Sequence, residues 1–208
     1  MAVPSISFER SLGYPMKDPN WLKKVLLGGV FTLIPIAGIL FLLGFMKKLF
    51  LTLVQDENAL IPELDLGADL SAGLGVLGVG ICWGLMLIPA MLLMIIPVIG
   101  PLAYMAIAAT VVPVALMRYF TTGQFGAAFE FKAIFAFIKE NSSNVLMMFA
   151  VSFVAQLIAG FGIIACFVGI LFTGFWALLV RTHAMAAVWR ASQVGAIEQP
   201  RILAPPVV

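Results

Sequence analysis

The sequence predicts an all-α integral membrane protein built from helical hairpins. Of its 208 residues, 62% are hydrophobic and 11% are charged, whereas about 25% of a soluble domain is charged. Residues 73–117 and 145–180 contain no charged side chain. Because a helix needs about 20 apolar residues to cross a hydrocarbon core of about 30 Å, each stretch has roughly the length of two crossings.

Two of the predicted hairpins follow directly from these apolar stretches. The hairpin at residues 73–117 reverses at residues 97–101, where two prolines and a glycine end the first arm. The hairpin at residues 145–189 reverses around residues 165–169, which contain no proline. Together, these two hairpins predict about four full membrane spans.

The first apolar block, residues 25–45, allows two interpretations. It is long enough for one crossing, but two lysines precede it at residues 23–24 and two follow it at residues 47–48. A single crossing would place basic residues on both sides of the membrane, although Lys and Arg normally gather on the cytoplasmic side. The alternative, which we favour, is a short or re-entrant hairpin over residues 22–54. Its bend at residues 34–38 (IPIAG) resembles residues 96–100 (IPVIG), a weak internal repeat.

Between the second and third hairpins, residues 125–141 predict an amphipathic helix. Its apolar positions follow one helical face: Ala127, Phe131, Ile134, Phe135 and Ile138. A helix of this kind lies in the membrane interface, here on the cytoplasmic side.

The chain is therefore expected to form one membrane domain, residues 1–190, followed by a flexible C-terminal tail, residues 191–208. The three hairpin bends lack charge, whereas the flanking segments are basic, so both termini are expected in the cytoplasm. The opening segment carries Glu9 and Arg10 and lacks the apolar core of a signal peptide. We expect a multi-pass membrane protein.

Two groups of residues are candidates for binding. Arg181, His183 and Arg190 lie near the end of the last predicted span and are candidates for a basic rim that contacts lipid headgroups. A second group of mostly small residues is a candidate face for helix packing: Gly73, Gly75, Gly78, Gly80, Gly84, Gln156, Gly160 and Gly162. Either the protein's own helices or a partner can occupy such a face.

Enzymatic activity, cofactors and metal sites are not expected. Catalysis inside a membrane usually requires ionisable groups at membrane depth, and the apolar stretches at residues 73–117 and 145–180 contain no charged side chain. His183, the sole histidine, has no nearby nucleophile or carboxylate in the sequence, and Cys82 and Cys166 are isolated in apolar segments. The acidic linker at residues 55–71 does not have the spacing of a calcium loop and is expected to be solvated surface. A net charge of +2, without a basic run, argues against nucleic acid.

The opening segment resembles a prokaryotic family of small multi-pass membrane proteins known only as a domain of unknown function. The resemblance rests on FERSLGYP at residues 8–15, DPNW at residues 18–21, and Lys24 with Gly28 and Gly29. It continues in LIPE at residues 60–63 and in residues 118–129, which hold Arg118, Thr122 and the AAF of residues 127–129. The resemblance implies a compact domain of helical hairpins, distantly similar to Yip-type membrane proteins, without a catalytic motif.

These observations favour a non-enzymatic membrane protein. We expect either an accessory or scaffold subunit of a larger membrane complex, or a lipid-organising protein. Its expected partners are membrane lipids and other integral membrane proteins, or further copies of itself. The alternative is a channel or carrier for a neutral or apolar small solute, which needs no buried charge.

Overall fold

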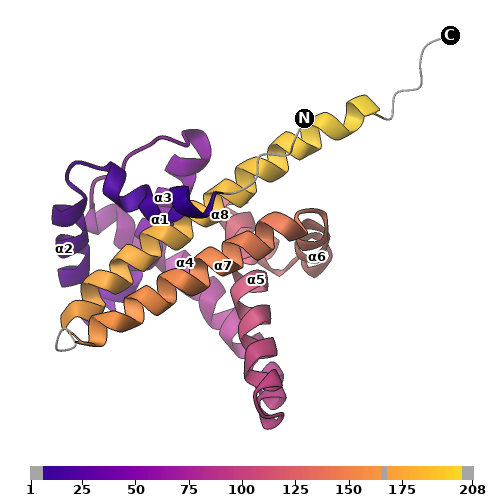
Figure 1. Ribbon diagram of the computed structural model, residues 1–208, viewed down its shortest axis with the longest axis horizontal. Coiled ribbons are helices and arrows are strands. Elements are labelled where there is room, and N and C mark those ends of the chain that lie inside the picture. Colours follow the sequence, from indigo (N-terminus) through magenta and orange to yellow (C-terminus); the bar gives the residue numbers. More distant parts are fainter. Residues whose placement is uncertain (1–6, 165–167, 203–208) are drawn as a thin grey trace.

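The computed structural model describes residues 7–164 and 168–202, and all regular secondary structure in these residues is helical (Figure 1). The elements are α1 (Phe8–Gly13), η1 (Tyr14–Lys17), α2 (Trp21–Phe31), α3 (Ala37–Gln55), α4 (Leu66–Leu87), η2 (Pro89–Ile95), α5 (Ile99–Thr122), η3 (Phe125–Phe129), α6 (Phe131–Glu140), α7 (Ser142–Phe161), η4 (Gly162–Ile164) and α8 (Val168–Ile202). Five of them are long and apolar enough to cross a membrane: α3, α4, α5, α7 and the Gly169–Val194 part of α8. The predicted all-α membrane fold is confirmed.

The core forms where the long helices α3, α4, α5, α7 and α8 meet. Helix α3 packs against both α4 and α8, and α7 lies antiparallel to α8. The hairpin formed by α4, η2 and α5 leaves this core at an angle, with η2 at its tip (Figure 1). Large apolar side chains near the tip are exposed, among them Leu92 at 69% and Ile95 at 76%. Exposure of this extent suits contact with lipid rather than water.

The structure decides between the two interpretations of the first apolar block. Helix α2 has 11 residues, too few to cross a membrane. Arg10 Nη1 lies 3.1 Å from Glu57 Oε1, and Lys24 Nζ donates to the Ile61 carbonyl. The segment before α2 and the segment after α3 therefore lie together on one side of the protein. The predicted hairpin over residues 22–54 is correct, and its second arm, α3, is of span length.

The predicted repeat of the first two bends is confirmed in the backbone. Ile36 has φ 65° and ψ −59°, and Val98 has φ 65° and ψ −56°. In both bends the amide after this residue donates to the proline carbonyl before it, at 2.6 Å and 2.8 Å. This is the γ-turn with positive φ, which is rare and strained, especially at β-branched residues. The IP-x-x-G pattern therefore specifies the same turn twice.

Replacing Ile36 with glycine is expected to stabilise the protein by about 1 kcal/mol, because strain of this kind costs about 1–3 kcal/mol and glycine adopts positive φ freely. Both Ile36 and Val98 are 72% exposed, so little packing is lost. The free energy of unfolding, measured by SDS titration in mixed micelles, should rise for Ile36→Gly and for Val98→Gly. Ile36→Ala is the control, and a loss of stability in both glycine variants would contradict the strained turn.

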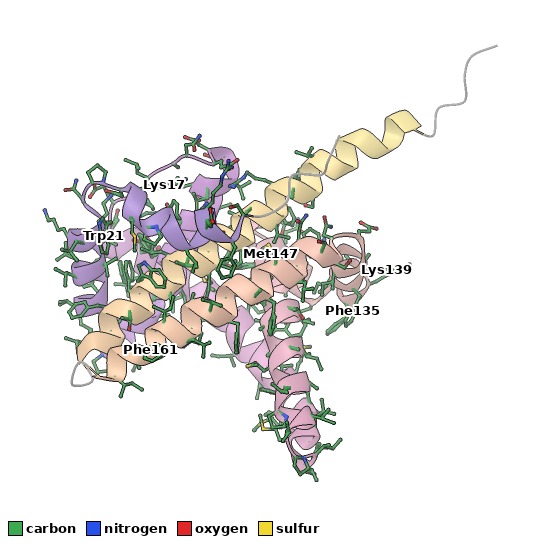
Figure 2. All side chains as sticks on the ribbon, viewed as in Figure 1. Lys17, Trp21, Phe135, Lys139, Met147 and Phe161 are labelled. Atoms are coloured by element: carbon green, nitrogen blue, oxygen red, sulfur yellow. The ribbon has the colours of Figure 1, made fainter. Side chains whose placement is uncertain are left out.

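The amphipathic segment differs from the single helix predicted for residues 125–141. The structure divides it at Glu130 (φ −77°, ψ 76°) into η3 and α6. The break lets the Ala128 carbonyl accept a hydrogen bond from the buried Trp83 Nε1 at 3.0 Å. Ile134 is fully buried, whereas Phe135 is 56% exposed and points away from the bundle (Figure 2). Only part of the predicted apolar face therefore packs against protein.

The third predicted hairpin is present, and its second arm, α8, is longer than predicted. Thr173 Oγ1 donates to the Ala159 carbonyl at 2.9 Å, which joins the two arms α7 and α8. The predicted reversal at residues 165–169 lies partly outside the described residues, as does Cys166. Helix α8 continues through the predicted start of the tail to Ile202, and residues 203–208 lie outside the described part.

Candidate functional site: an interhelical cleft around Arg181

Two neighbouring cavities lie between the α7–α8 hairpin and the mid-length part of α5. The larger has a volume of about 310 Å³ and is lined by α3, α5, α7 and α8. The smaller, of about 140 Å³, is lined by α5, α7 and α8. Arg181 and Gln156 line both cavities, so we treat them as one cleft, here called the Arg181 cleft.

Arg181 lies deeper along the helices than the sequence predicted. Thr173 bonds to Ala159, and α7 and α8 are antiparallel, so a residue eight positions after Thr173 lies near residue 151 of α7. Consistent with this register, Phe149, Ser152 and Phe153 line the smaller cavity with Arg181. These residues lie about 10–18 Å from the ends of α7 at 1.5 Å per residue. Arg181 therefore lies beside the middle of α7 and within the Gly169–Val194 part of α8 that is long and apolar enough to cross a membrane.

The walls of the Arg181 cleft are almost entirely apolar. Leu43 and Met46 of α3, Val112 and Leu116 of α5 and Leu178 of α8 line the larger cavity. The polar lining side chains are Arg181, Gln156 and Ser152. The cleft can therefore hold an apolar chain and one anionic group.

Pro113 also shapes the α5 wall of the cleft. It lies inside α5 and lines the larger cavity, while Ala109, four residues earlier, lines the smaller one. Proline has no amide hydrogen, so it cannot donate the helical hydrogen bond to the Ala109 carbonyl. The α5 wall therefore presents a helix that is locally weakened where it borders the cleft.

His183 lies on another face of α8, in a buried contact with the N-terminal segment. Its Nδ1 is 3.2 Å from Ser11 Oγ, and its ring stacks on Tyr14 at a centroid distance of 4.7 Å. Both His183 and Ser11 are buried. The expectation that no nucleophilic side chain lies near His183 was wrong. Ser11 and His183 lie 172 positions apart in the chain, which hides this contact from sequence analysis.

The three residues predicted to form a basic rim do not come together. Arg190 Nη1 donates to the Leu53 carbonyl at the end of α3, and His183 is covered by α1 and η1. Two positions along a helix correspond to a rotation of about 200°, so Arg181 and His183 point to opposite sides of α8. Of the three, Arg181 lines the cleft.

The N-terminal segment is held by a buried ion pair. Lys24 Nζ lies 2.8 Å from Asp18 Oδ2, and the Asn20 amide donates to Asp18 Oδ1 at 2.7 Å. Burial alone would raise the pKa of the Asp18 carboxyl, but these hydrogen bonds and the charge of Lys24 outweigh it and lower the pKa. Burial, with the nearby Asp18 charge, raises the pKa of the Tyr14 phenol. Asp18 is therefore anionic and Tyr14 neutral at neutral pH.

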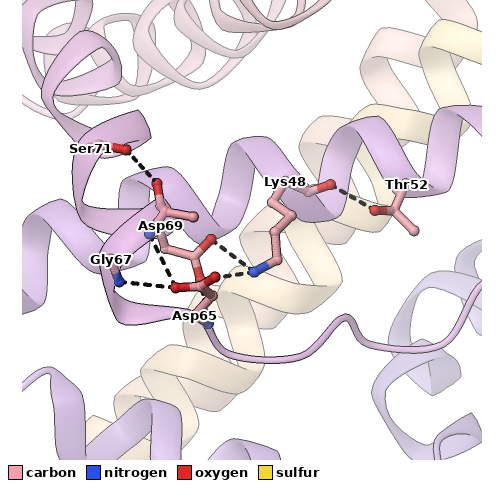
Figure 3. A network of polar contacts seen from close by, with 7 residues as sticks. Lys48, Thr52, Asp65, Gly67, Asp69 and Ser71 are labelled. Atoms are coloured by element: carbon pink, nitrogen blue, oxygen red, sulfur yellow. Dashed lines mark hydrogen bonds and ion pairs between the residues drawn. The ribbon is translucent and has the colours of Figure 1, made fainter.

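A second buried ion pair joins α3 to α4 (Figure 3). Lys48 Nζ lies 2.9 Å and 3.0 Å from the two carboxylate oxygens of Asp69, and Asp69 Oδ2 also accepts the Asp65 amide at 3.0 Å. Asp65 in turn caps α4 by accepting the amides of Gly67 and Ala68. The acidic linker is thus only partly the solvated surface expected, because Asp69 is buried.

The predicted small-residue face divides into internal contacts and open positions. A Cβ added at Gly73, Gly75 or Gly162 would lie 1.9–2.3 Å from Leu40, Tyr119 or Thr173, respectively. At Gly78 the nearest atom would be 3.3 Å away, on Phe125. At Gly80, Gly84 and Gly160 no atom of the described residues lies within 4 Å, and Gln156 lines the Arg181 cleft. The sequence did not single out Gly44, where a Cβ would lie 1.7 Å from the Asp69 carbonyl oxygen.

Comparison with known proteins adds a family match for a central part of the chain, residues 90–168. No curated protein and no solved structure matches. The opening signature at residues 8–24 and the first linker lie outside the matched part, whereas the resemblance at residues 118–129 lies within it. Residues 90–168, from η2 to the start of α8, match the model of a family described as a protein of unknown function (DUF4013).

Proposed function

We propose that this chain is a non-enzymatic, lipid-organising membrane protein that acts as an accessory or scaffold subunit. One observation carries the proposal: the Arg181 cleft, with apolar walls from four helices and a single cation. Gln156 and Arg181 are both exposed at the cleft, so its mouth faces the surrounding membrane rather than the protein core. A cleft of this type is suited to holding a lipid between two helical hairpins.

The packing around His183 supports a non-enzymatic role. A serine and a histidine within hydrogen-bond distance resemble a nucleophile and its base. However, Ser11 has no exposed surface, and Tyr14 covers the His183 ring. A substrate would have to displace the N-terminal segment to reach this pair, so we assign the pair to anchoring α1 and η1 on α8.

Purification from native membranes tests the proposal. In mild detergent, the full-length protein is expected to retain lipid or a membrane partner. Ala108 lines the cleft, so Ala108→Trp should fill it and reduce the retained lipid. Ala106→Trp, two residues away on α5 and outside the cleft lining, is the matched control. A monomer that carries neither tightly held lipid nor a partner would contradict the proposal.

A second candidate function, a carrier for a neutral or apolar solute, uses the same cavities. The larger cavity borders Pro113, and a proline-broken helix is a common moving part of transporters. Flux of uncharged solutes into liposomes distinguishes the two functions. Flux that Ala108→Trp abolishes would favour the carrier, whereas lipid retention without flux favours the lipid-organising protein.

We propose a location in a bacterial or archaeal inner membrane, with both termini in the cytoplasm. Met16 and Asn58 are exposed and lie on the same side of the first hairpin, whereas Ile96 lies in the second bend. In a background without native cysteines, Met16→Cys and Asn58→Cys should react with a membrane-impermeant maleimide only from the cytoplasmic side. Ile96→Cys should react only from the opposite side. Labelling of Asn58→Cys from outside would overturn this orientation.

The opening signature and the Yip-like resemblance lead to a narrower proposal. We propose that residues 8–24 and 60–63 mark the same family as the matched residues 90–168, and that the hairpins of this family are arranged as in Yip-type proteins. The support is sequence resemblance together with the observed hairpins. Superposition of this structure on an experimental Yip-type structure would refute the second part if the hairpins did not coincide.

A further inference from the structure

We infer that the Arg181 cleft binds an anionic phospholipid, with its phosphate on the Arg181 guanidinium and part of an acyl chain in the larger cavity. This inference rests on the proposed function and names the lipid class that the protein would organise. It depends on the depth of Arg181, on the pairing of charges elsewhere in the chain, and on the shape of the cleft.

The depth of Arg181 makes an uncompensated charge costly. Its neighbours on α7 are Phe149, Ser152 and Phe153, near the middle of that helix. Ionisable side chains within membrane segments are expensive, and they usually mark a ligand or ion site. The exposed guanidinium can reach toward the membrane surface, but its surroundings in the cleft are apolar. An anionic ligand would remove this cost.

The carboxylates that form ion pairs in the described residues are paired with cations other than Arg181. Within the described residues, the ion pairs are Arg10–Glu57, Lys24–Asp18, Lys48–Asp69 and Arg118–Glu130. No carboxylate of the described residues lies within ion-pair distance of Arg181 or lines its cleft. A guanidinium presents a planar fork of donors that matches phosphate oxygens in a bidentate arrangement. A phosphate group would therefore supply the negative charge that balances Arg181 in the cleft.

The remaining lining fits the other parts of a phospholipid. Gln156 and Ser152, which lie one turn apart on α7, offer hydrogen-bond donors beside Arg181 for the phosphate or the glycerol esters. Leu43, Met46 and Leu178 provide an apolar wall. The mouth of the cleft faces the membrane, so a lipid can enter sideways without leaving the bilayer. This combination favours a two-part ligand over inorganic phosphate.

Native mass spectrometry can test the inference on the full-length protein. The protein would be delipidated and then incorporated into nanodiscs of phosphatidylglycerol or phosphatidylcholine with identical acyl chains. The wild type should retain phosphatidylglycerol in preference to phosphatidylcholine after release from the disc. Arg181→Gln should lower phosphatidylglycerol binding by about tenfold or more, the effect expected for a lost charged hydrogen bond. Arg181→Lys should lose less, because it keeps the charge but not the fork.

Matched variants separate this site from general attraction to anionic lipid. Lys139 is an exposed cation on α6 (Figure 2), and no residue of α6 lines the cleft, so Lys139→Gln should retain the lipid as the wild type does. If Arg181→Gln does not fold, phosphatidylglycerol retention by Arg181→Lys and by Gln156→Leu is compared with that of the wild type to test the inference. Both should then bind phosphatidylglycerol more weakly than the wild type.

Several results would overturn the inference. The first is that Arg181→Gln retains as much phosphatidylglycerol as the wild type. The second is that inorganic phosphate displaces the lipid. The third is that the protein retains a fatty acid alone and that this retention depends on Arg181. Retention of phosphatidylcholine or of a protein partner, independent of Arg181, would overturn this inference and leave the proposed function standing. Retention of neither lipid nor partner would remove both.

Discussion

Gly73→Ala is expected to lower the free energy of unfolding by about 3 kcal/mol, the upper end of the usual cost of overpacking. An added Cβ would lie 1.9 Å from the Leu40 carbonyl oxygen, an atom of the α3 backbone. The contact is reciprocal, because Gly44 of α3 faces the Asp69 carbonyl of α4 in the same way. Since backbone cannot rotate aside as a side chain can, α3 and α4 must separate. SDS titration in mixed micelles would measure the loss.

Gly80→Ala, in the same helix, is the matched control. No described atom lies within 4 Å of the Cβ position at Gly80. Alanine is favoured over glycine in a helix by about 0.5–1 kcal/mol, so this variant should be neutral or slightly stabilised. Equal losses for Gly73→Ala and Gly80→Ala would show that α3 and α4 are not in close backbone contact.

Lys48→Met is expected to destabilise the protein by about 3 kcal/mol, the lower end of the cost of breaking a buried ion pair. The substitution leaves the Asp69 carboxylate buried with only the Asp65 amide as a partner. Lys48 itself is 30% exposed at its side chain, which is why the lower figure applies. The same SDS titration can compare the free energy of unfolding of the wild type, in which the pair is intact, with that of the variant.

The double variant Lys48→Met/Asp69→Leu shows whether the loss comes from the unpaired charge. Replacing both partners with apolar residues is often close to neutral, so most of the stability should return. Glu57→Gln is the control for an exposed pair, because Arg10 and Glu57 are 68% and 49% exposed at their side chains. It should cost less than about 1 kcal/mol. A double variant as unstable as Lys48→Met would contradict a charge-based explanation.

The hairpins were predictable because their signals are local. Uncharged stretches longer than a membrane crossing indicate spans, and the prolines and glycines at residues 35–38 and 97–101 indicate reversals. The likeness of the first two bends was identified as a weak internal repeat, and the structure adds that Ile36 and Val98 have nearly the same backbone angles. The break at Glu130 was not predictable in this way, because it depends on Trp83 reaching the Ala128 carbonyl from another helix.

The candidate site was only partly predictable. Arg181, His183 and Gln156 were each identified from residue type and position, but their separate environments could not be read from spacing. The depth of Arg181 follows from how α8 pairs with α7, and the cleft exists because α5 diverges from that pair. The buried contact of His183 depends on a segment that lies 172 residues away in the chain.

By itself, the sequence determined the membrane class, the all-helical fold and the places where the chain reverses, because hydropathy and turn chemistry act over a few residues. Only the tertiary structure decided that the first hairpin returns to the side where it began, that Asp69 is buried on Lys48, and that Arg181 faces an apolar cleft. Each of these depends on the distance between helices that are remote in sequence. The physical reason is that the cost of burying a charge is set by whatever side chain, backbone or lipid lies opposite it in the fold.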